Sequence, residues 1–134
     1  MTKERINPSS VFQKVDLGFS QAVAASGRKA LYVSGQTAWD VNKQLVGGSD
    51  LRAQARQAFL NLRHIVEASG GTLGDVVSLR IYVVAYEAPK AAAVRGAFRE
   101  FFSGDATPAS TWVGIAALAD PGFLIEIEAI AVID

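Results

Sequence analysis

The sequence predicts a single α+β domain in which two helices cover one face of a β-sheet. Three observations support this fold class. Of the 134 residues, 50% are hydrophobic, which suffices for one full-sized core. Two segments have the spacing of amphipathic helices, and short runs rich in β-forming residues lie before, between and after them. No repeat, linker or low-complexity segment divides the chain, so we expect one domain over residues 1–134.

The first predicted strand is ALYVSGQT, residues 30–37, which is rich in β-forming residues. A polar stretch and the segment LVGG follow it, so the pattern predicts a hairpin with a short returning strand. A helix should begin at Ser49 or Asp50, either of which can cap it, and end near Ser69 before two glycines. Its apolar residues fall within about a third of the circumference and predict a core-facing side: Leu51, Ala55, Ala58, Phe59, Leu62, Ile65 and Val66.

In the second half of the chain, VVSLRIYVVA at residues 76–85 predicts a central strand. A second helix should open near Pro89, because proline is tolerated in a first turn, and continue to about Phe102. TWVGIAAL and FLIEIEAIAVI predict two more strands joined by a turn at ADPG. Alternation places four residues of the central strand on one face: Val77, Leu79, Ile81 and Val83.

The last predicted strand carries two carboxylates, Glu126 and Glu128, on the same face. The pattern alone leaves two interpretations open, a solvated outer face or an acid in a cleft, and carboxylates are most often exposed or paired. Much of that sheet face is apolar, so we expect it to associate with another protein surface: Tyr82, Trp112, Ile130 and Val132.

Composition excludes several classes of protein. The 13 basic and 13 acidic side chains cancel, which argues against nucleic acid or an anionic membrane as partner. The absence of cysteine excludes disulfides, thiolate nucleophiles and thiolate metal sites, and favours the cytoplasm. The segment MTKERINPSS is polar, and no run approaches eighteen apolar residues, so we expect no membrane segment.

The single histidine, His64, lies on the polar side of the first helix. That position argues against a histidine-based triad or metal centre, so we expect neither a metal nor a cofactor. Arg52, Arg56 and Arg63 form a cationic stripe on the same helix. The stripe could contact RNA phosphates, but it lacks interleaved aromatic residues, so a solvated helix face is favoured.

Two other arginines are candidates for a cleft. Arg95 borders the buried stripe of the second helix, from which a guanidinium can reach past the rim. Arg80 projects from the predicted sheet face that also carries Tyr82. Either arginine could instead form a structural ion pair with Glu126 or Glu128.

Five segments, in this order, resemble the RidA family, also called YjgF or endoribonuclease L-PSP-like proteins. LGFSQAV is similar to the family's G-P-Y-S-Q-A-V, and LYVSGQT to its strand ending in S-G-Q. TPASTWVGIAAL is similar to P-A-R-S-x-V-x-V-x-x-L. The matching segments lie at residues 17–23, 31–37, 54–77, 107–118 and 125–132.

The resemblance implies a chorismate-mutase-like α+β fold with a mixed sheet, and a homotrimer with three clefts between subunits. It also implies a small-molecule ligand and hydrolysis of reactive enamines or imines, such as 2-aminoacrylate, to keto acids and ammonia. Two alternatives stay open. Some family members are named ribonucleases, and a trimer of this kind could be a non-catalytic small-molecule-binding or chaperone-like protein.

Carried over by residue, Glu126 matches the glutamate that positions or activates the hydrolytic water. Phe19 replaces a tyrosine whose hydroxyl holds ligand, and Arg95 stands where an asparagine is common. The resemblance implies the following cleft-lining residues: Phe19, Ser34, Gly35, Gln36, Arg95, Ser110 and Trp112.

Two further positions depart from the family pattern. Ser110 replaces the arginine that grips the substrate carboxylate, and Trp112 replaces a small residue such as cysteine. Losing a charge-assisted pair of this kind costs about 1.5–3 kcal/mol of binding. We therefore expect a substrate that differs from 2-aminoacrylate and is larger or less charged.

Overall fold

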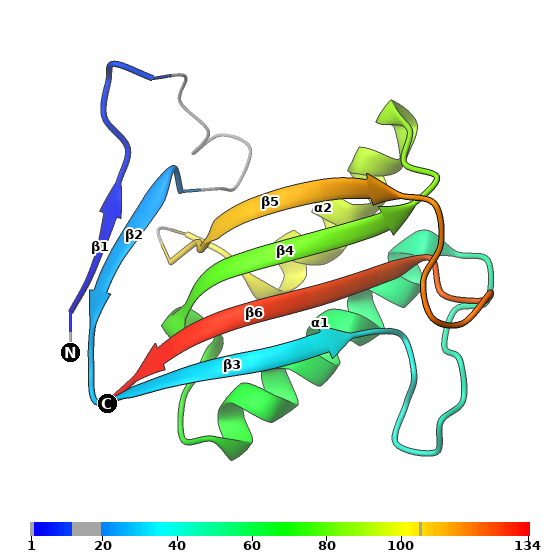
Figure 1. Ribbon diagram of the computed structural model, residues 1–134, viewed down its shortest axis with the longest axis horizontal. Coiled ribbons are helices and arrows are strands. Elements are labelled where there is room, and N and C mark those ends of the chain that lie inside the picture. Colours follow the sequence, from blue (N-terminus) through cyan, green and yellow to red (C-terminus); the bar gives the residue numbers. More distant parts are fainter. Residues whose placement is uncertain (1, 12–19, 105) are drawn as a thin grey trace.

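The computed structural model describes residues 2–11, 20–104 and 106–134, and it has two layers (Figure 1). One layer is a four-stranded sheet in the order β3-β6-β4-β5. β6 pairs antiparallel with both β3 and β4, whereas β4 and β5 run parallel. The strand bounds are Lys29–Gln36 for β3, Val76–Val84 for β4, Ala109–Ile115 for β5 and Ile125–Ile133 for β6.

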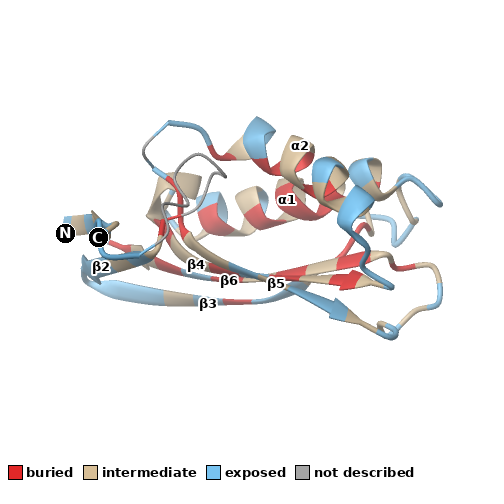
Figure 2. Cartoon of the chain, turned by 90° about the horizontal axis from the view of Figure 1, so that it is seen from above, coloured by how far each residue is buried: buried red, intermediate tan, exposed pale blue. Residues whose placement is uncertain are grey.

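The other layer consists of two helices on one face of the sheet (Figure 2). They are α1, Leu51–Ala68, and α2, Ala91–Phe101. Short 3-10 turns lie before β4 and α2, namely η2 (Leu73–Asp75) and η3 (Ala88–Lys90). Two helices covering one face of a mixed sheet confirm the predicted fold class.

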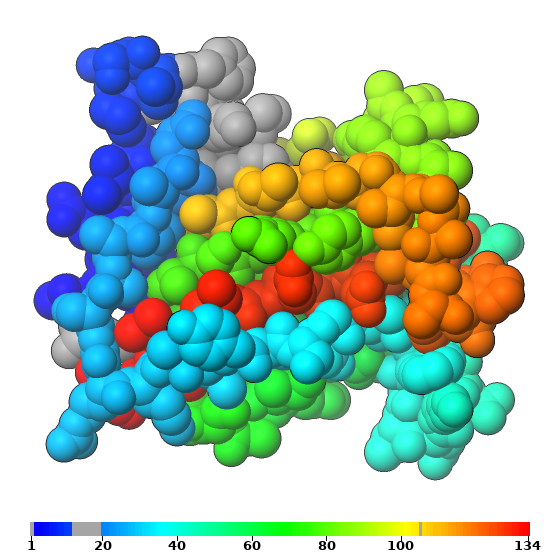
Figure 3. All heavy atoms as spheres, viewed as in Figure 1, coloured from blue at the N-terminus to red at the C-terminus, as the bar shows by residue number. Residues whose placement is uncertain are grey.

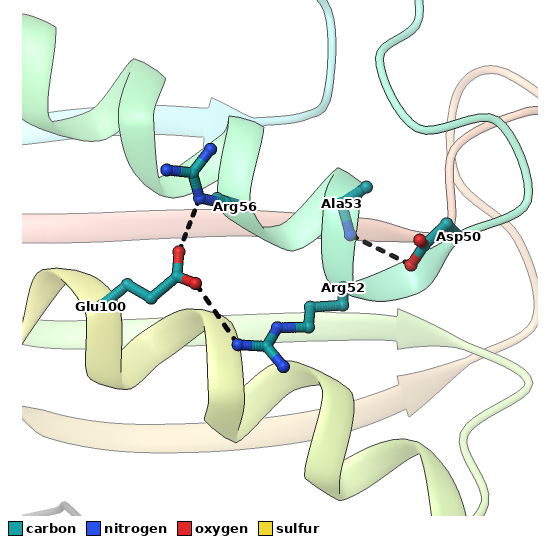
Figure 4. A network of polar contacts seen from close by, with 5 residues as sticks. All are labelled: Asp50, Arg52, Ala53, Arg56 and Glu100. Atoms are coloured by element: carbon teal, nitrogen blue, oxygen red, sulfur yellow. Dashed lines mark hydrogen bonds and ion pairs between the residues drawn. The ribbon is translucent and has the colours of Figure 1, made fainter.

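Local signals explain where α1 begins and ends. The Asp50 side chain accepts a hydrogen bond of 3.2 Å from the backbone amide of Ala53, as the cap prediction requires (Figure 4). Gly70 follows the helix with a φ of 91°, a conformation that glycine adopts without steric cost. Glu100 of α2 lies between Arg52 and Arg56 of α1 and ties the exposed surfaces of the helices together.

The core lies between the helices and the sheet. The buried side of β6 consists of every second residue from Ile125 to Ile133, which leaves Glu126 and Glu128 on the opposite, open face. Aromatic rings fill the space under α2, where the rings of Phe98 and Phe102 stack at 4.8 Å. The predicted face of α1 is confirmed, with one addition: Gln54 is fully buried.

Two details differ from the sequence prediction. LVGG is not a returning strand, because β3 pairs with β6 and only one isolated bridge joins Trp39 to Leu45. The segment ADPG does form a turn between β5 and β6, as predicted, and β4 lies between these two strands in the sheet. In β4 the buried residue is Val76 rather than Val77, since the register with β6 shifts between Val76 and Ser78.

The structure also contains a two-stranded antiparallel sheet that the sequence pattern did not indicate. It pairs β1, Thr2–Ile6, with β2, Ala22–Ser26. Lys3 of β1 forms an ion pair of 2.7 Å with Asp75, which attaches this ribbon to the turn before β4. In the described part of the chain, no helix has the length and hydropathy required to cross a membrane.

Candidate functional site

Glu126 lies on the open face of the sheet, beside Tyr82 of β4 and next to the irregular end of β3. A Cβ atom built on Gly35 would stand 2.5 Å from both Cδ and Oε1 of Glu126. No real Cβ atom is found so close to a neighbouring atom, so the carboxylate rests directly on the glycine backbone. The structure therefore brings together two of the residues that the resemblance assigns to the cleft, Gly35 and Glu126.

The neighbours of Gly35 flank this contact. Ser34 is exposed, and the Gln36 side chain donates a hydrogen bond of 3.0 Å to the Ser34 carbonyl oxygen. Gln36 also lines a shallow groove that runs between α1 and the loop after β3, together with Trp39 and His64. The S-G-Q segment thus forms the edge of the Glu126 site.

Glu128 has a different environment from Glu126, although both lie on the same face. The Tyr82 hydroxyl donates a short hydrogen bond to Glu128, and the Arg80 guanidinium lies 3.7 Å from the same carboxylate oxygen. The hydrogen bond to Glu128, together with desolvation, raises the pKa of Tyr82 above its ordinary value of 10.0. Glu128 is therefore a structural carboxylate, and the structural alternative for Arg80 is confirmed.

The open face is apolar around these charges, and Figure 3 views it directly. Tyr32 is 76% exposed there, and its partner across the strands, Ile130, is 37% exposed. Together with Arg80 and Glu128 they line a hollow of about 180 Å³.

A second group of candidate residues lies on the other side of the sheet. In the parallel register Ser110 pairs with Leu79 and Trp112 with Ile81, and both partners are buried under the helices. Trp112 accordingly packs against the core, so its predicted place on the association face is wrong. The pairing of β5 with β4 decides this orientation, and the strand pattern alone does not reveal it.

Arg95 of α2 joins this second group. Its guanidinium carbon lies 5.8 Å from the centroid of the Trp112 ring. Both Arg95 Nε and Ser110 Oγ are inaccessible to solvent, and neither has a hydrogen-bond partner in the structure as described. Phe19, the remaining predicted ligand contact, lies outside the described residues.

The candidate residues thus form two groups on opposite faces of the sheet. The first, which we call the water site, contains Gly35 and Glu126. The second, which we call the α2–β5 site, contains Arg95, Ser110 and Trp112. One chain does not place both groups around one cavity.

Sequence reasoning missed Gln54, which supports the water site from below. Its side-chain amide donates to the carbonyl oxygens of Gly48 and Gly122, at 2.6 and 2.9 Å. Its side-chain oxygen accepts from the Leu124 amide at 3.0 Å. These bonds fix the chain just before β6 and hence the position of Glu126. A polar residue inside an apolar helix stripe was the available signal.

Other sequence predictions concern the helices. His64 is exposed, as predicted. Arg52 and Arg56 pair with Glu100, which agrees with a solvated helix face rather than a nucleic-acid surface. Within residues 2–11, 20–104 and 106–134, no three side chains of the metal-binding types gather closely enough to hold an ion.

A mixed sheet covered on one face by two helices is the α+β architecture that the resemblance to YjgF proteins implies. The chain belongs to the family described as Endoribonuclease L-PSP, whose model matches residues 13–133. The resemblance to RidA proteins is thereby confirmed.

Named relatives agree with this assignment. A 2-iminobutanoate/2-iminopropanoate deaminase of Dermatophagoides farinae is 34% identical over 116 residues, which cover 87% of this chain and 86% of that protein. The crystal structure of YyfB, a Rid family protein of unknown function from Yersinia pestis, superimposes with a TM-score of 0.94 at 41% identity, covering 98% and 99% of the two chains. RidA from an Antarctic Psychrobacter species gives a TM-score of 0.69 at 35% identity, with 85% and 87% covered.

Proposed function

We propose that the protein hydrolyses a small imine or enamine to a carbonyl compound and ammonia, with Glu126 as the general base. The contact between Glu126 and Gly35 is the observation that carries this proposal. It holds a carboxylate at the rim of the sheet, close to the exposed Ser34 backbone, where water and a small ligand can reach it. The deaminase name of the Dermatophagoides relative supports the same reaction.

The chemistry requires one carboxylate. Glu126 accepts a proton from water as the oxygen attacks the imine carbon, which forms a C–O bond and moves the C=N electron pair to nitrogen. Glu126 returns this proton to the nitrogen, which completes the carbinolamine. The hydroxyl proton then passes through Glu126 to the nitrogen as the C–N bond breaks, the C=O bond forms and ammonia leaves. An enamine enters this sequence after tautomerising to its imine.

We propose that three copies assemble through the open face. Tyr32 and Ile130 would otherwise expose apolar surface beside the charges of Glu128 and Arg80. Because the water site and the α2–β5 site lie on opposite faces of one chain, assembly can join the water site of one copy to the α2–β5 site of the next. Each complete cleft then contains residues from two subunits.

The substrate should differ from 2-aminoacrylate. Ser110 cannot supply the guanidinium that the resemblance implies at that position, and Trp112, two residues further along β5, adds an aromatic ring to the same face. A cleft with an aromatic wall favours an imine with a longer or flatter side chain.

The test is turnover on a panel of imines generated in situ, from 2-aminoacrylate to aryl-substituted imines, with RNA as a separate substrate. We expect keto acid and ammonia from at least one imine, and a 10²- to 10⁴-fold loss of that rate in Glu126→Gln. Glu128→Gln is the matched control, two residues away on the same face, and should stay within a few fold of wild type. RNA cleavage without imine turnover, or binding of imines without turnover, would replace the proposal by one of the two alternatives.

A further inference from the structure

Arg95 differs from the other arginines that the structure describes in having a buried Nε without a hydrogen-bond partner. Four other arginines contact oxygen acceptors, whereas Arg63 lies over the Phe101 ring. Arg52 and Arg56 contact Glu100, Arg80 contacts Glu128, and Arg5 donates to the carbonyl oxygens of Thr107 and Gly74. Arg95 is within ion-pair distance of no carboxylate in the described part of the chain, and its Nε is shielded from solvent. A buried, charged donor without an acceptor is rare in folded proteins and calls for a missing partner.

The Trp112 ring gives Arg95 a fixed position. With the guanidinium carbon 5.8 Å from the ring centroid, a cation–π contact stabilises the charge and limits the rotamers of the long side chain. An aromatic ring accepts no hydrogen bond in the plane of the guanidinium. The fork of N–H groups therefore stays available to a planar oxyanion.

Ser110 adds a hydroxyl group to this site, because it lies on β5 and on the same face of that strand as Trp112. It lies two residues before Trp112, which corresponds to about 7 Å along β5. Its Oγ is also buried without a hydrogen-bond partner among the described residues. β5 is an edge strand, so Ser110 lies at a border of the four-stranded sheet.

We propose that Arg95 and Ser110 bind the carboxylate of the substrate, with the Trp112 ring as the wall behind the guanidinium. This inference rests on the proposed function, because hydrolysis of a 2-imino acid gives a 2-oxo acid with that same carboxylate. A single guanidinium and a hydroxyl match one negative charge and two oxygens, the chemistry of a carboxylate. The Arg95 guanidinium comes from helix α2, whereas an arginine at position 110 would come from strand β5. The ligand is therefore bound at a different angle than it would be by an arginine at position 110.

The test measures binding of 2-oxobutanoate, a stable 2-oxo acid, and of its uncharged methyl ester. Trp112 serves as the reporter by fluorescence in a Trp39→Phe background, because the chain contains two tryptophans. We expect a saturable signal with the acid and at least tenfold weaker binding of the ester. Arg95→Gln should weaken acid binding at least tenfold and remove the preference for the acid, and Ser110→Ala should weaken it a few fold.

Arg99→Gln is the matched control, since Arg99 lies one turn further along α2 and is exposed. Its binding should equal that of the background protein. If Arg95→Gln fails to fold, Arg95→Lys keeps the charge and loses the fork, and it should retain a weakened preference for the acid. Equal acid binding in the Arg95→Gln and control variants, or equal binding of acid and ester in the background protein, would overturn the inference.

The outcomes also separate this inference from the proposed function. If 2-oxobutanoate binding depends on Arg95 but the protein hydrolyses no imine, the carboxylate site is supported and the proposed hydrolase activity is overturned. If the Arg95→Gln variant hydrolyses imines with an unchanged KM, the proposed hydrolase activity is supported and the carboxylate site is overturned.

Discussion

The water site and the α2–β5 site differ in how closely they follow the RidA pattern. Gly35 and Glu126 match the family residues and are in direct contact on the open face. Ser110 and Trp112 depart from the pattern, and Arg95 of another element lies over the Trp112 ring. Under the proposed function, the hydrolytic group and the group that selects the substrate occupy separate structural units. Specificity can then change on β5 and α2 without moving the reacting carboxylate.

A cleft that joins the water site of one copy to the α2–β5 site of the next requires that copies of the chain meet through the open face of the sheet. We expect Ile130→Asp to dissociate the assembly to monomers, because a carboxylate would be buried among apolar residues without a partner. Imine hydrolysis should fall at least 100-fold, since separated chains cannot join the two sites. Light scattering after size exclusion measures the assembly. Val41→Asp is the control, because Val41 is 98% exposed on the loop after β3. A wild-type chain that is already monomeric and active would refute the composite cleft.

A change at the water site should leave the α2–β5 site intact. Gly35→Ala would place a Cβ atom against the Glu126 carboxylate and displace it. We expect kcat for imine hydrolysis to drop about 10- to 100-fold, as for misplaced catalytic groups generally, with binding of 2-oxobutanoate unchanged within about twofold. Gly74→Ala serves as the control, because its added Cβ would make only an ordinary contact with Thr72 at 3.4 Å. Equal rates in both alanine variants would show that the Gly35 contact has no role in positioning the carboxylate.

Exchanging the charged group at the α2–β5 site should change the substrate preference. The double change Arg95→Asn with Ser110→Arg recreates the arrangement that the family pattern describes. We expect it to hydrolyse 2-aminoacrylate several-fold faster than wild type, measured as pyruvate released. Ser110→Arg alone should gain less, because Arg95 would repel the new guanidinium, so the two changes should be coupled. Additive effects of the two substitutions would show that the residues act independently.

The smallest effect concerns the ribbon of β1 and β2, which borders β5 through the bridge between Ser20 and Ala109. Desolvation alone would raise the pKa of Asp75, but hydrogen bonds from Lys3 and from the Thr72 amide outweigh it and lower the pKa below its ordinary value of 3.8. A lowered folded-state pKa stabilises the fold above the ordinary value, and this stabilisation is lost as the pH falls below it.

We therefore expect Asp75→Asn to reduce the free energy of unfolding by about 1–3 kcal/mol at neutral pH, measured by urea denaturation. The difference from wild type should shrink as the pH falls below about 4. A difference independent of pH would assign the effect to packing rather than to the Lys3–Asp75 pair.

Periodicity predicted the elements that contain many apolar residues. The spacing in α1 and the alternation in β6 depend on local geometry, so both faces were correct. The ribbon of β1 and β2 was missed because TKERI is polar and AVAAS is rich in alanine, and neither run has strong β propensity. The face of Trp112 was also missed, since a parallel neighbour distant in the sequence sets the orientation of β5.

For the candidate site, the resemblance supplied the residue types and the structure supplied their grouping. Sequence reasoning placed Glu126 on an outer strand face but left a solvated acid and a cleft acid open. The contact with Gly35 depends on an irregularity in β3 that no periodic pattern reveals. The position of Arg95 over Trp112 likewise depends on how α2 packs against β5.

Subunit complementation tests the central claim most directly, because it asks whether the water site of one chain works with the α2–β5 site of another. Glu126→Gln, nearly inactive alone, and Arg95→Gln, weakened at least tenfold at substrate concentrations far below KM, are co-refolded in equal amounts. Imine hydrolysis by the mixture is measured at such a concentration. If each cleft takes Glu126 from one copy and Arg95 from its neighbour, random mixing leaves about a quarter of the clefts intact, and about a quarter of wild-type activity should return. A mixture no more active than the two variants alone would contradict the account.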